Sequence, residues 1–247
     1  MFDYTAPETL LKDKVILITG AGDGIGKAAA LSYAQHGATI ILLGRTTQKL
    51  ESVYDQIDQL GYPQAAIIPL NLESATEHDF LEITNTIEAE FGRLDGLLHN
   101  ASLLGQRTPI ADYDPNLFEQ VMRVNVHSQF LLTQALLPLI NKAEQGRIIF
   151  TSSGVGRTAK PNWGAYAVSK FATEAMMQLF ASEAPESSQT RINAINPGAT
   201  RTAMRANAYP DENPLTLATA EDIMPLYLFL MGQDSQNTNG QSIDAQQ

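Results

Sequence analysis

The sequence predicts an α/β protein in which helices cover both faces of a parallel sheet of about seven strands. Short apolar runs recur along the chain and are continuous rather than alternating, which is typical of strands buried on both faces. The segments between these runs repeat apolar residues at intervals of three and four, as in Leu50, Val53 and Ile57, and therefore predict helices. The alternation of strand and helix predicts a doubly wound sheet within a single domain over residues 1–247.

The predicted elements alternate in order along the chain. Strands are expected at 14–19, 39–43, 65–70, 94–99, 147–151 and 191–196, with a seventh at 240–245. Helices are expected after the first strand, around 50–60 and 80–91, near 115–138, at 165–183 and at 222–232. No internal repeat or low-complexity tract interrupts this order.

Composition argues against several classes of function. The chain has 16 basic and 27 acidic side chains, a formal charge of −11 and no run of Lys and Arg, which disfavours nucleic acid and anionic membranes as partners. It contains no cysteine, and its four histidines, 36, 78, 99 and 127, lack ligand spacing, so we expect no metal. No basic leader precedes an apolar stretch, and no apolar run is long enough to span a bilayer, so we expect a cytoplasmic protein.

A glycine-rich turn follows the first strand. Gly20, Gly24 and Gly26 lie in TGAGDGIGKAAALSYA, between that strand and an alanine-rich helix. Glycine lacks the Cβ that would block close approach, and a helix N-terminus offers free N–H groups to a pyrophosphate. This context predicts a Rossmann fold that binds a dinucleotide. A methyltransferase or a flavoprotein also uses such a turn, so the turn alone does not decide the function.

Motifs along the whole chain resemble the short-chain dehydrogenase/reductase family. These motifs are TGxxxGxG at 19–26, HNA at 99–101, Asn125 within RVNV, Ser153, YxxxK at 166–170 and NPG at 196–198. The resemblance spans residues 12 to about 245 and is closest to the YciK-like branch of bacterial proteins labelled oxoacyl-carrier-protein reductases. It implies an NAD(P)(H)-dependent oxidoreductase (EC 1.1.1.-) that acts on a small carbonyl or alcohol substrate, including 3-oxoacyl thioesters.

The resemblance implies four catalytic residues. Tyr166 and Lys170 are four residues apart, so a helix places both side chains on one face. In the family the tyrosine exchanges a proton with the substrate oxygen, Ser153 matches the residue that hydrogen-bonds this oxygen, and Asn125 matches the one that supports a proton relay to the lysine. A free phenol has a pKa of about 10, so we expect Lys170 and an oxidised nicotinamide to lower the pKa of Tyr166.

The resemblance also implies which residues bind the cofactor. Departures from the family pattern are His99 and Ser102 in HNAS, where NNAG is usual, and Asn71, where an aspartate usually meets the adenine. The full expected set is Gly20, Gly22, Asp23, Gly24, Ile25, Gly26, Arg45, Asn71, Leu72, Asn100, Ala101, Tyr166, Lys170, Pro197, Gly198, Thr200 and Thr202.

Two residues give opposite indications about the cofactor. Arg45 directly follows the second strand, where a guanidinium can bind a ribose 2′-phosphate. Asp23, within the glycine turn, would repel this phosphate if its side chain pointed inward. We give Arg45 more weight because a surface aspartate is readily screened. The sequence therefore favours NADP(H), with NAD(H) as the alternative.

Substrate identity is weakly encoded. The segment 203–218 corresponds to the family's substrate lid, and its Pro and Asn content suits a loop. Four basic residues, Arg157, Lys160, Arg201 and Arg205, are expected near the entrance, either to attract an anionic substrate or as scattered solvated charges. The acidic segment 182–189 disfavours docking of a carrier protein.

Two further expectations concern the oligomeric state of the protein and an alternative function without catalysis. The helices near 115–138 and 165–183 carry more apolar residues than one sheet-facing side requires, and the family resemblance implies a homodimer or homotetramer through them. Deep burial within one subunit is the alternative. A protein that binds NAD(P) as a sensor without turnover is the alternative function.

Overall fold

Seven parallel strands form one sheet in the order β3-β2-β1-β4-β5-β6-β7, which confirms the predicted fold class. A computed structural model describes residues 1–185 and 188–246. The strands are β1 (Val15–Thr19), β2 (Thr39–Gly44), β3 (Ala66–Pro69), β4 (Gly96–His99), β5 (Arg147–Thr151), β6 (Arg191–Asn196) and β7 (Ser242–Asp244). The last strand is shorter than the run 240–245 that predicted it.

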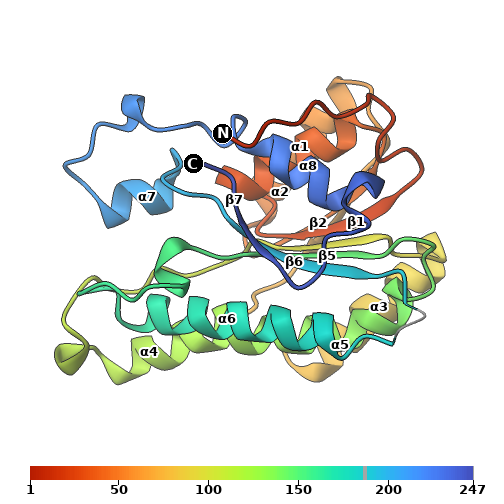
Figure 1. The fold of residues 1–247 in the computed structure, drawn as a ribbon. Coiled ribbons are helices and arrows are strands. Elements are labelled where there is room, and N and C mark those ends of the chain that lie inside the picture. Colours follow the sequence, from red (N-terminus) through yellow and green to blue (C-terminus); the bar gives the residue numbers. More distant parts are fainter. Residues whose placement is uncertain (186–187, 247) are drawn as a thin grey trace.

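Helices cover both faces of this sheet (Figure 1). On one face lie α1 (Gly24–Gln35), α2 (Thr47–Gln59) and α8 (Met224–Met231). On the other lie α3 (Glu77–Phe91), α4 (Pro115–Met122), α5 (Ser128–Ile140) and α6 (Gly164–Ser182), with a π-helical turn (Arg123–His127) joining α4 to α5. The short helix α7 (Ala203–Ala208) stands apart, beyond one end of the strands.

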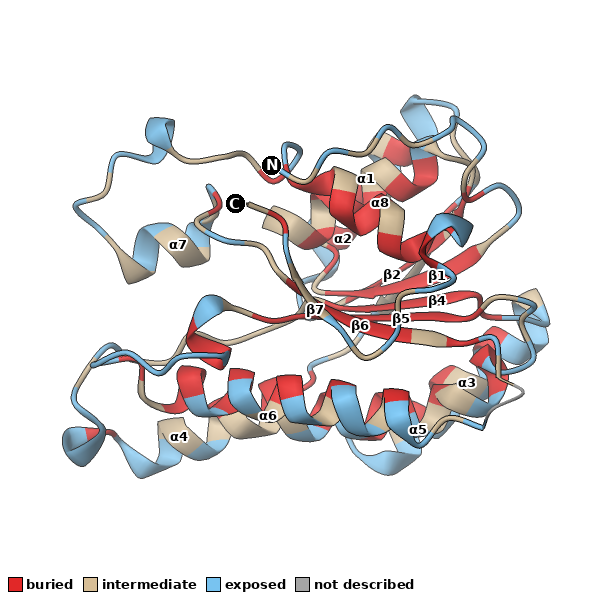
Figure 2. Ribbon diagram, in the orientation of Figure 1, coloured by how far each residue is buried: buried red, intermediate tan, exposed pale blue. Residues whose placement is uncertain are grey.

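The continuous apolar strands are explained by two cores. Along β1 the side chains of Ile16 and Ile18 pack in the core beneath α1 and α8, while Val15 and Leu17 pack in the core beneath α3 and α5. All five residues of β1 are buried, as the red sheet in Figure 2 shows. Since both faces are covered, no position in the strand needs a polar side chain.

The strand order places several segments at one edge of the sheet. From β1, the strands β2 and β3 are added on one side of the sheet, and β4 to β7 are added on the other side. Because the strands are parallel, the loops after β1, β4, β5 and β6 all leave the same edge. Such a switch point is where open α/β sheets bind ligands. Among the described residues, no helix is long and apolar enough to cross a membrane.

Candidate active site

The glycine turn after β1 packs against the segment after β4. Gly20 has φ +68°, and a Cβ at this position would lie 2.9 Å from the Ala101 Cα. Gly26 is buried behind the turn, where a Cβ would meet the Asn100 amide nitrogen at 2.6 Å. Gly20 therefore allows both a left-handed turn and close approach of two backbones, while Gly26 allows close packing of the α1 helix.

A threonine that the motif analysis did not single out joins these two segments. The Thr19 hydroxyl oxygen accepts hydrogen bonds from the backbone N–H groups of Asn100 and Ala101, each at 3.0 Å. It thereby fixes the end of β4 relative to the glycine turn. In the sequence, the feature that could have indicated this role is a hydroxyl residue at the last position of an otherwise apolar strand.

Two adjoining cavities lie along this edge of the sheet. The Tyr166 cavity has a volume of about 310 Å³, and the Arg45 cavity a volume of about 440 Å³. Among the predicted site residues, the Tyr166 cavity is lined by Gly20, Asp23, Gly24, Ile25, Asn100, Ala101, Ser153, Tyr166, Lys170, Pro197, Gly198, Thr200 and Thr202. The Arg45 cavity adds Gly22, Arg45, Asn71 and Leu72. Gly26 and Asn125 line neither cavity.

The first two turns of α6 carry the predicted catalytic pair. Tyr166 and Lys170 are both buried, and the Lys170 Nζ lies 5.4 Å from the centroid of the tyrosine ring. The ammonium donates a hydrogen bond to the Thr151 carbonyl oxygen at 2.7 Å. Ser153, two residues beyond this carbonyl, lines the same cavity. The loop after β5 and the start of α6 thus bring the three side chains together.

Burial dominates the protonation of this pair. Desolvation raises the pKa of Tyr166 to about 12, opposed by a hydrogen bond with Ser153. This direction is opposite to the lowering expected from the sequence, because burial of the phenol disfavours its ionised form. Desolvation also lowers the pKa of Lys170 to about 8, opposed by the charge of Glu174. The phenol therefore holds its proton at neutral pH.

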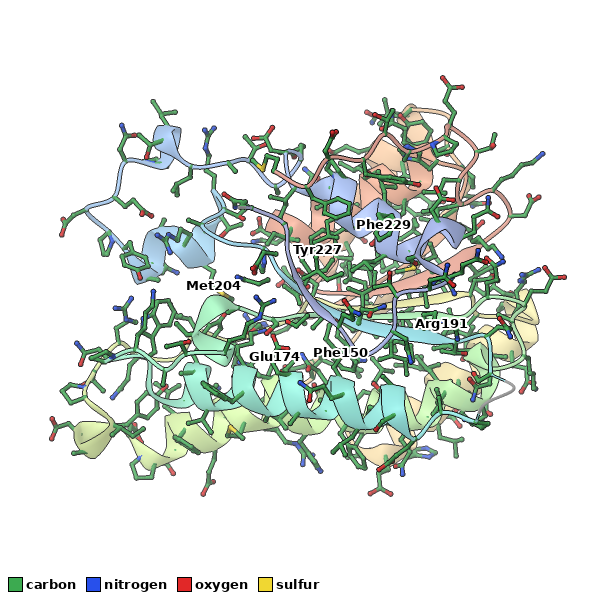
Figure 3. All side chains as sticks on the ribbon, viewed as in Figure 1. Phe150, Glu174, Arg191, Met204, Tyr227 and Phe229 are labelled. Carbon is green, nitrogen blue, oxygen red and sulfur yellow. The ribbon has the colours of Figure 1, made fainter. Side chains whose placement is uncertain are left out.

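Glu174 is a buried carboxylate one helical turn after Lys170. It accepts hydrogen bonds from the hydroxyl groups of Ser152 and Ser242, the second at 2.7 Å, and the Arg157 guanidinium lies 3.6 Å away. Figure 3 shows its side chain rising from α6 toward the sheet. Glu174 therefore joins the loop that carries Ser153 to α6 and β7.

Asn125 lies in the π-helical turn between α4 and α5. Its side-chain oxygen accepts from the Leu103 N–H at 2.7 Å, and its amide donates to the Leu103 carbonyl at 2.9 Å and to the Ser169 hydroxyl at 3.0 Å. An extended turn of this kind is frequent at functional sites. The sequence predicted a helix here but not its widened turn, which aims this amide between the loop after β4 and α6.

The two departures in HNAS have different surroundings. His99 is buried, stacks on Phe150 and hydrogen-bonds the Thr133 hydroxyl at 2.8 Å. Burial lowers its pKa to about 3, so the ring is neutral. The Ser102 hydroxyl is buried at the wall shared by both cavities and has no hydrogen-bond partner within the described chain. His99 is therefore structural, whereas Ser102 can serve a bound group.

The conflict between Arg45 and Asp23 is reduced by Lys49, which motif reasoning missed. Asp23 caps α1 by accepting from the Gly24 N–H at 2.8 Å, and its other oxygen pairs with the Lys49 ammonium at 2.5 Å. This hydrogen bond lowers the pKa of Asp23. Lys49 and Arg45 are both exposed and line the Arg45 cavity. The carboxylate is therefore neutralised by a cation beside the place expected to hold a phosphate.

The predicted basic entrance is wrong for most of its members. Arg157 pairs with Asp244 at 2.7 Å, and Arg201 donates to the backbone carbonyls of Pro214 and Leu217. Of the four predicted residues, only Arg205 lines the Tyr166 cavity. The guanidinium groups of Arg157 and Arg201 instead donate to acceptors within the protein.

Two more predictions concern the surface near the site. Lys160 is exposed in the loop before α6. Within the acidic segment 182–189, residues 186 and 187 lie outside the described residues.

The Thr202 hydroxyl caps α7 by accepting a hydrogen bond from the Arg205 N–H at 3.1 Å. Thr202 therefore has the capping role that was the alternative for it, and it also lines the Tyr166 cavity.

Comparisons with known proteins agree with this geometry. A family model for short chain dehydrogenase matches residues 14–213. The uncharacterized oxidoreductase YciK of Escherichia coli (strain K12) is 50% identical over 243 residues, covering 98% of this chain and 96% of YciK. A solved short chain dehydrogenase from Pseudomonas syringae is 57% identical, with a TM-score of 0.96 and 100% of both chains covered. Another, from Escherichia coli CFT073 and complexed with NADPH, is 51% identical, with a TM-score of 0.95, covering 98% of this chain and 100% of that one.

Proposed function

Because the chain belongs to the short-chain dehydrogenase family, we propose that it is an NADP(H)-dependent oxidoreductase that interconverts a carbonyl compound and its alcohol. The observation that carries this proposal is the meeting of Ser153, Tyr166 and Lys170 in one cavity, with Asn125 behind them. A relative of similar fold that was solved with NADPH supports the choice of cofactor.

The residues present fit a dinucleotide. Gly20 lines the Tyr166 cavity without a side chain, and Gly24 and Ile25 line it at the N-terminus of α1, where a helix offers N–H groups to a phosphate. The unpartnered Ser102 hydroxyl supplies a further polar contact at the wall between the two cavities. In this proposal Asn71 and Leu72 hold the adenine end, while Lys170 and Thr202 hold the nicotinamide end.

Arg45 and Lys49 support NADP(H) over NAD(H). Both are exposed cations on the wall of the same cavity, and no carboxylate stands at the position of Arg45 to receive a ribose 2′-hydroxyl. A guanidinium can bind phosphate through two parallel hydrogen bonds. We assign Arg45 to the 2′-phosphate.

The protein side chains supply the acid and the positioning. When bound, the nicotinamide supplies or accepts the hydride at the carbonyl carbon. In the reductive direction Tyr166, protonated because it is buried, donates its hydroxyl proton to the substrate oxygen. Ser153 donates a hydrogen bond to the same oxygen as negative charge develops. Lys170 stabilises the resulting phenolate, and Asn125 holds α6 against the loop after β4.

The direct test removes one oxygen atom. Tyr166→Phe keeps the ring but lacks the proton, so we expect NADPH to bind as in wild type while carbonyl reduction falls by about two orders of magnitude or more. Cofactor fluorescence and NADPH oxidation at saturating ketone measure the two effects. Retained turnover would remove Tyr166 from the acid role.

The alternative, a sensor that binds NADP(H) without turnover, makes a different prediction. Its wild type would bind NADPH saturably yet oxidise it with no member of a broad carbonyl panel. The complete set of four catalytic residues favours the enzyme, because a sensor needs no proton donor in the cavity.

We also propose a single domain over 1–247, with residues 203–218 as a lid. The lid contains α7 and a short 3-10 turn (Pro214–Thr216), and a bridge between Thr200 and Ala218 brings its two ends together. Hinged segments closed at their base are suited to covering a ligand. Protection of this segment from proteolysis when NADP and a substrate analogue bind would support the assignment.

A homodimer or homotetramer through α5 and α6 is proposed from their outer faces. Four large apolar side chains, Phe130, Val168, Phe171 and Leu179, are exposed on these two helices. Apolar side chains gathered on neighbouring helices favour a partner surface. Light scattering at micromolar concentration tests this, and a monomer would contradict it.

A further inference from the structure

One wall of the Tyr166 cavity is apolar. It is formed by Leu104, Trp163, Met204 and Ala208, which pack around the Tyr166 ring as one hydrophobic cluster. These residues come from the loop after β4, the start of α6 and the lid. Met204 belongs to α7, and its side chain extends from this helix toward the layer that contains α6 (Figure 3). The space where a substrate carbonyl must meet Tyr166 is thus enclosed by hydrocarbon and aromatic surface.

The cation on the lid is neutralised within the protein. Arg205 makes two hydrogen bonds to the Glu212 carboxylate, at 2.6 and 2.7 Å. Its guanidinium also lies 3.8 Å from the centroid of the Tyr209 ring. Glu212 therefore neutralises the guanidinium charge and occupies its Nε–Nη2 edge, while the Tyr209 ring lies against the guanidinium.

A second cation, Arg107, is held by backbone acceptors. It donates to the carbonyl oxygens of Asn162 and Ala208, at 3.1 and 3.0 Å, and lies 4.2 Å from the Trp163 ring centroid. Arg107 therefore fastens the lid to the loop before α6. Its charge lies against the tryptophan rather than over the cavity floor.

The remaining charges disfavour an anion. The Lys170 ammonium donates to the Thr151 carbonyl and faces Glu174, so its charge is already compensated within the protein. An anionic group placed beside Tyr166 would lose its water without gaining an unpaired cation. A neutral group would lose little water and would contact the apolar wall.

Resting on the proposed function, we propose that the substrate is a neutral carbonyl compound whose groups adjacent to the carbonyl are apolar, and that carboxylates and phosphates close to the carbonyl are rejected. Leu104, Trp163 and Met204 determine this specificity. The exclusion concerns charges within the cavity, so a compound with a distant charge outside the lid is still accepted.

The protein contains its own probe for this proposal, because Trp163 is its single tryptophan and lines the cavity. Matched ligands are methyl 4-acetylbenzoate and 4-acetylbenzoate, which share the aryl ketone and differ in charge. Each is titrated into the NADP⁺ complex, where no reduction occurs, and Trp163 emission is followed. We expect the ester to bind at least about tenfold more tightly than the anion. Equal or tighter binding of the anion, or no saturable change with either ligand, would overturn the proposal.

Two matched variants test the wall itself. Met204→Lys adds a cation inside the cavity and should reduce or reverse the preference for the ester. Leu215→Lys adds the same charge on the lid at a side chain that is 76% exposed, and should leave the preference unchanged. NADPH affinity is measured for both variants to establish that they fold. A folded Met204→Lys protein with wild-type discrimination would contradict the assignment.

The same assays separate this proposal from the proposed function. Wild type that binds the ester but reduces no carbonyl compound would overturn the oxidoreductase assignment and leave the specificity of the cavity intact. Reduction of 4-acetylbenzoate as efficiently as of its methyl ester would overturn the specificity and leave the oxidoreductase assignment intact.

Discussion

The two ends of the cleft are built from different parts of the chain. Around Gly20 and Asn100 the cofactor end is shaped by backbone, because a tight turn, strand ends and a helix N-terminus approach one another closely. At the other end Leu104, Trp163 and Met204 form the wall with side chains from three separate segments. Backbone shape depends on a few glycines at fixed spacing, whereas a side-chain wall depends on where loops fold. The first end is therefore readable as a motif and the second is not.

The largest expected effect blocks the backbone-built end. Gly20→Ala would place a Cβ 2.9 Å from the Ala101 Cα, so we expect NADPH affinity to fall by about two orders of magnitude or more. Gly61→Ala is the matched control, because Gly61 also has a positive φ of +71° but has no neighbouring atom within 4 Å of the added Cβ. The control should lose only stability, of about 1 kcal/mol. Equal NADPH affinity for the two variants in fluorescence titrations would show that close approach at Gly20 is unimportant.

The pH dependence of kcat/KM tests the role of Lys170, which lines the Tyr166 cavity between the cofactor end and the apolar wall. Lys170 has a pKa of about 8, so kcat/KM for carbonyl reduction should fall as pH rises through this value and the ammonium is lost. Glu174 raises this pKa, so Glu174→Gln should move the falling limb to lower pH. Burial lowers the pKa of Lys170 and Glu174 raises it; Tyr166 and His99 are the other titratable groups near the ammonium, and Arg157 lies beside the carboxylate. An unmoved limb in a folded variant would show that Glu174 does not act on Lys170.

The lowered pKa of Lys170 also leads to a prediction of how the free energy of unfolding changes with pH. Its pKa is about 8 in the folded protein, against an ordinary value of 10.5, so between these values the unfolded chain binds the additional proton. The contribution of Lys170 to the free energy of unfolding therefore rises with pH across this window. Denaturant titrations of wild type and Lys170→Met at pH 8 and pH 10 measure it. We expect the free energy of unfolding of wild type to rise relative to that of Lys170→Met at the higher pH.

The smallest expected effect loosens the side-chain end. Arg107→Ala removes two hydrogen bonds to backbone carbonyls and the contact with Trp163, so the lid should close less well. We expect KM for a neutral ketone to rise about three- to tenfold with little change in NADPH affinity. Arg107→Lys keeps the charge without the planar fork and should resemble the alanine variant. If Arg107→Ala changed only the affinity for NADPH, Arg107 would act at the cofactor end of the cleft, which would contradict its proposed contact with the lid.

The sequence predicted the backbone-built end of the cleft better than the side-chain end. Continuous apolar strands and the glycine spacing predicted the sheet, and they placed Gly20, Tyr166 and Lys170 at one edge, because these features depend on local pattern and on parallel order. The partners of Asp23 and Arg205 were not predictable in this way. Lys49 lies in the next helix along the chain, and Glu212 in a loop, so only the folded chain shows that each neutralises its neighbour.

Thr19 and the π-helical turn around Asn125 show a second limit. Thr19 opened a predicted motif and Asn125 was a predicted site residue, but their hydrogen bonds to residues distant in sequence were not predictable. The same holds for the pKa of Tyr166, whose direction depends on burial by the surrounding cluster. Long-range desolvation and pairing are properties of the packed structure rather than of a motif.

Titration of NADPH and NADH into wild type and Arg45→Ala tests the central claim most directly, namely that the backbone-built end holds a dinucleotide whose 2′-phosphate meets Arg45. The account predicts tighter binding of NADPH than of NADH by wild type. In Arg45→Ala it predicts a selective loss of NADPH affinity of about tenfold or more, with NADH affinity little changed. Equal affinities in wild type, or an unchanged preference in the variant, would contradict it.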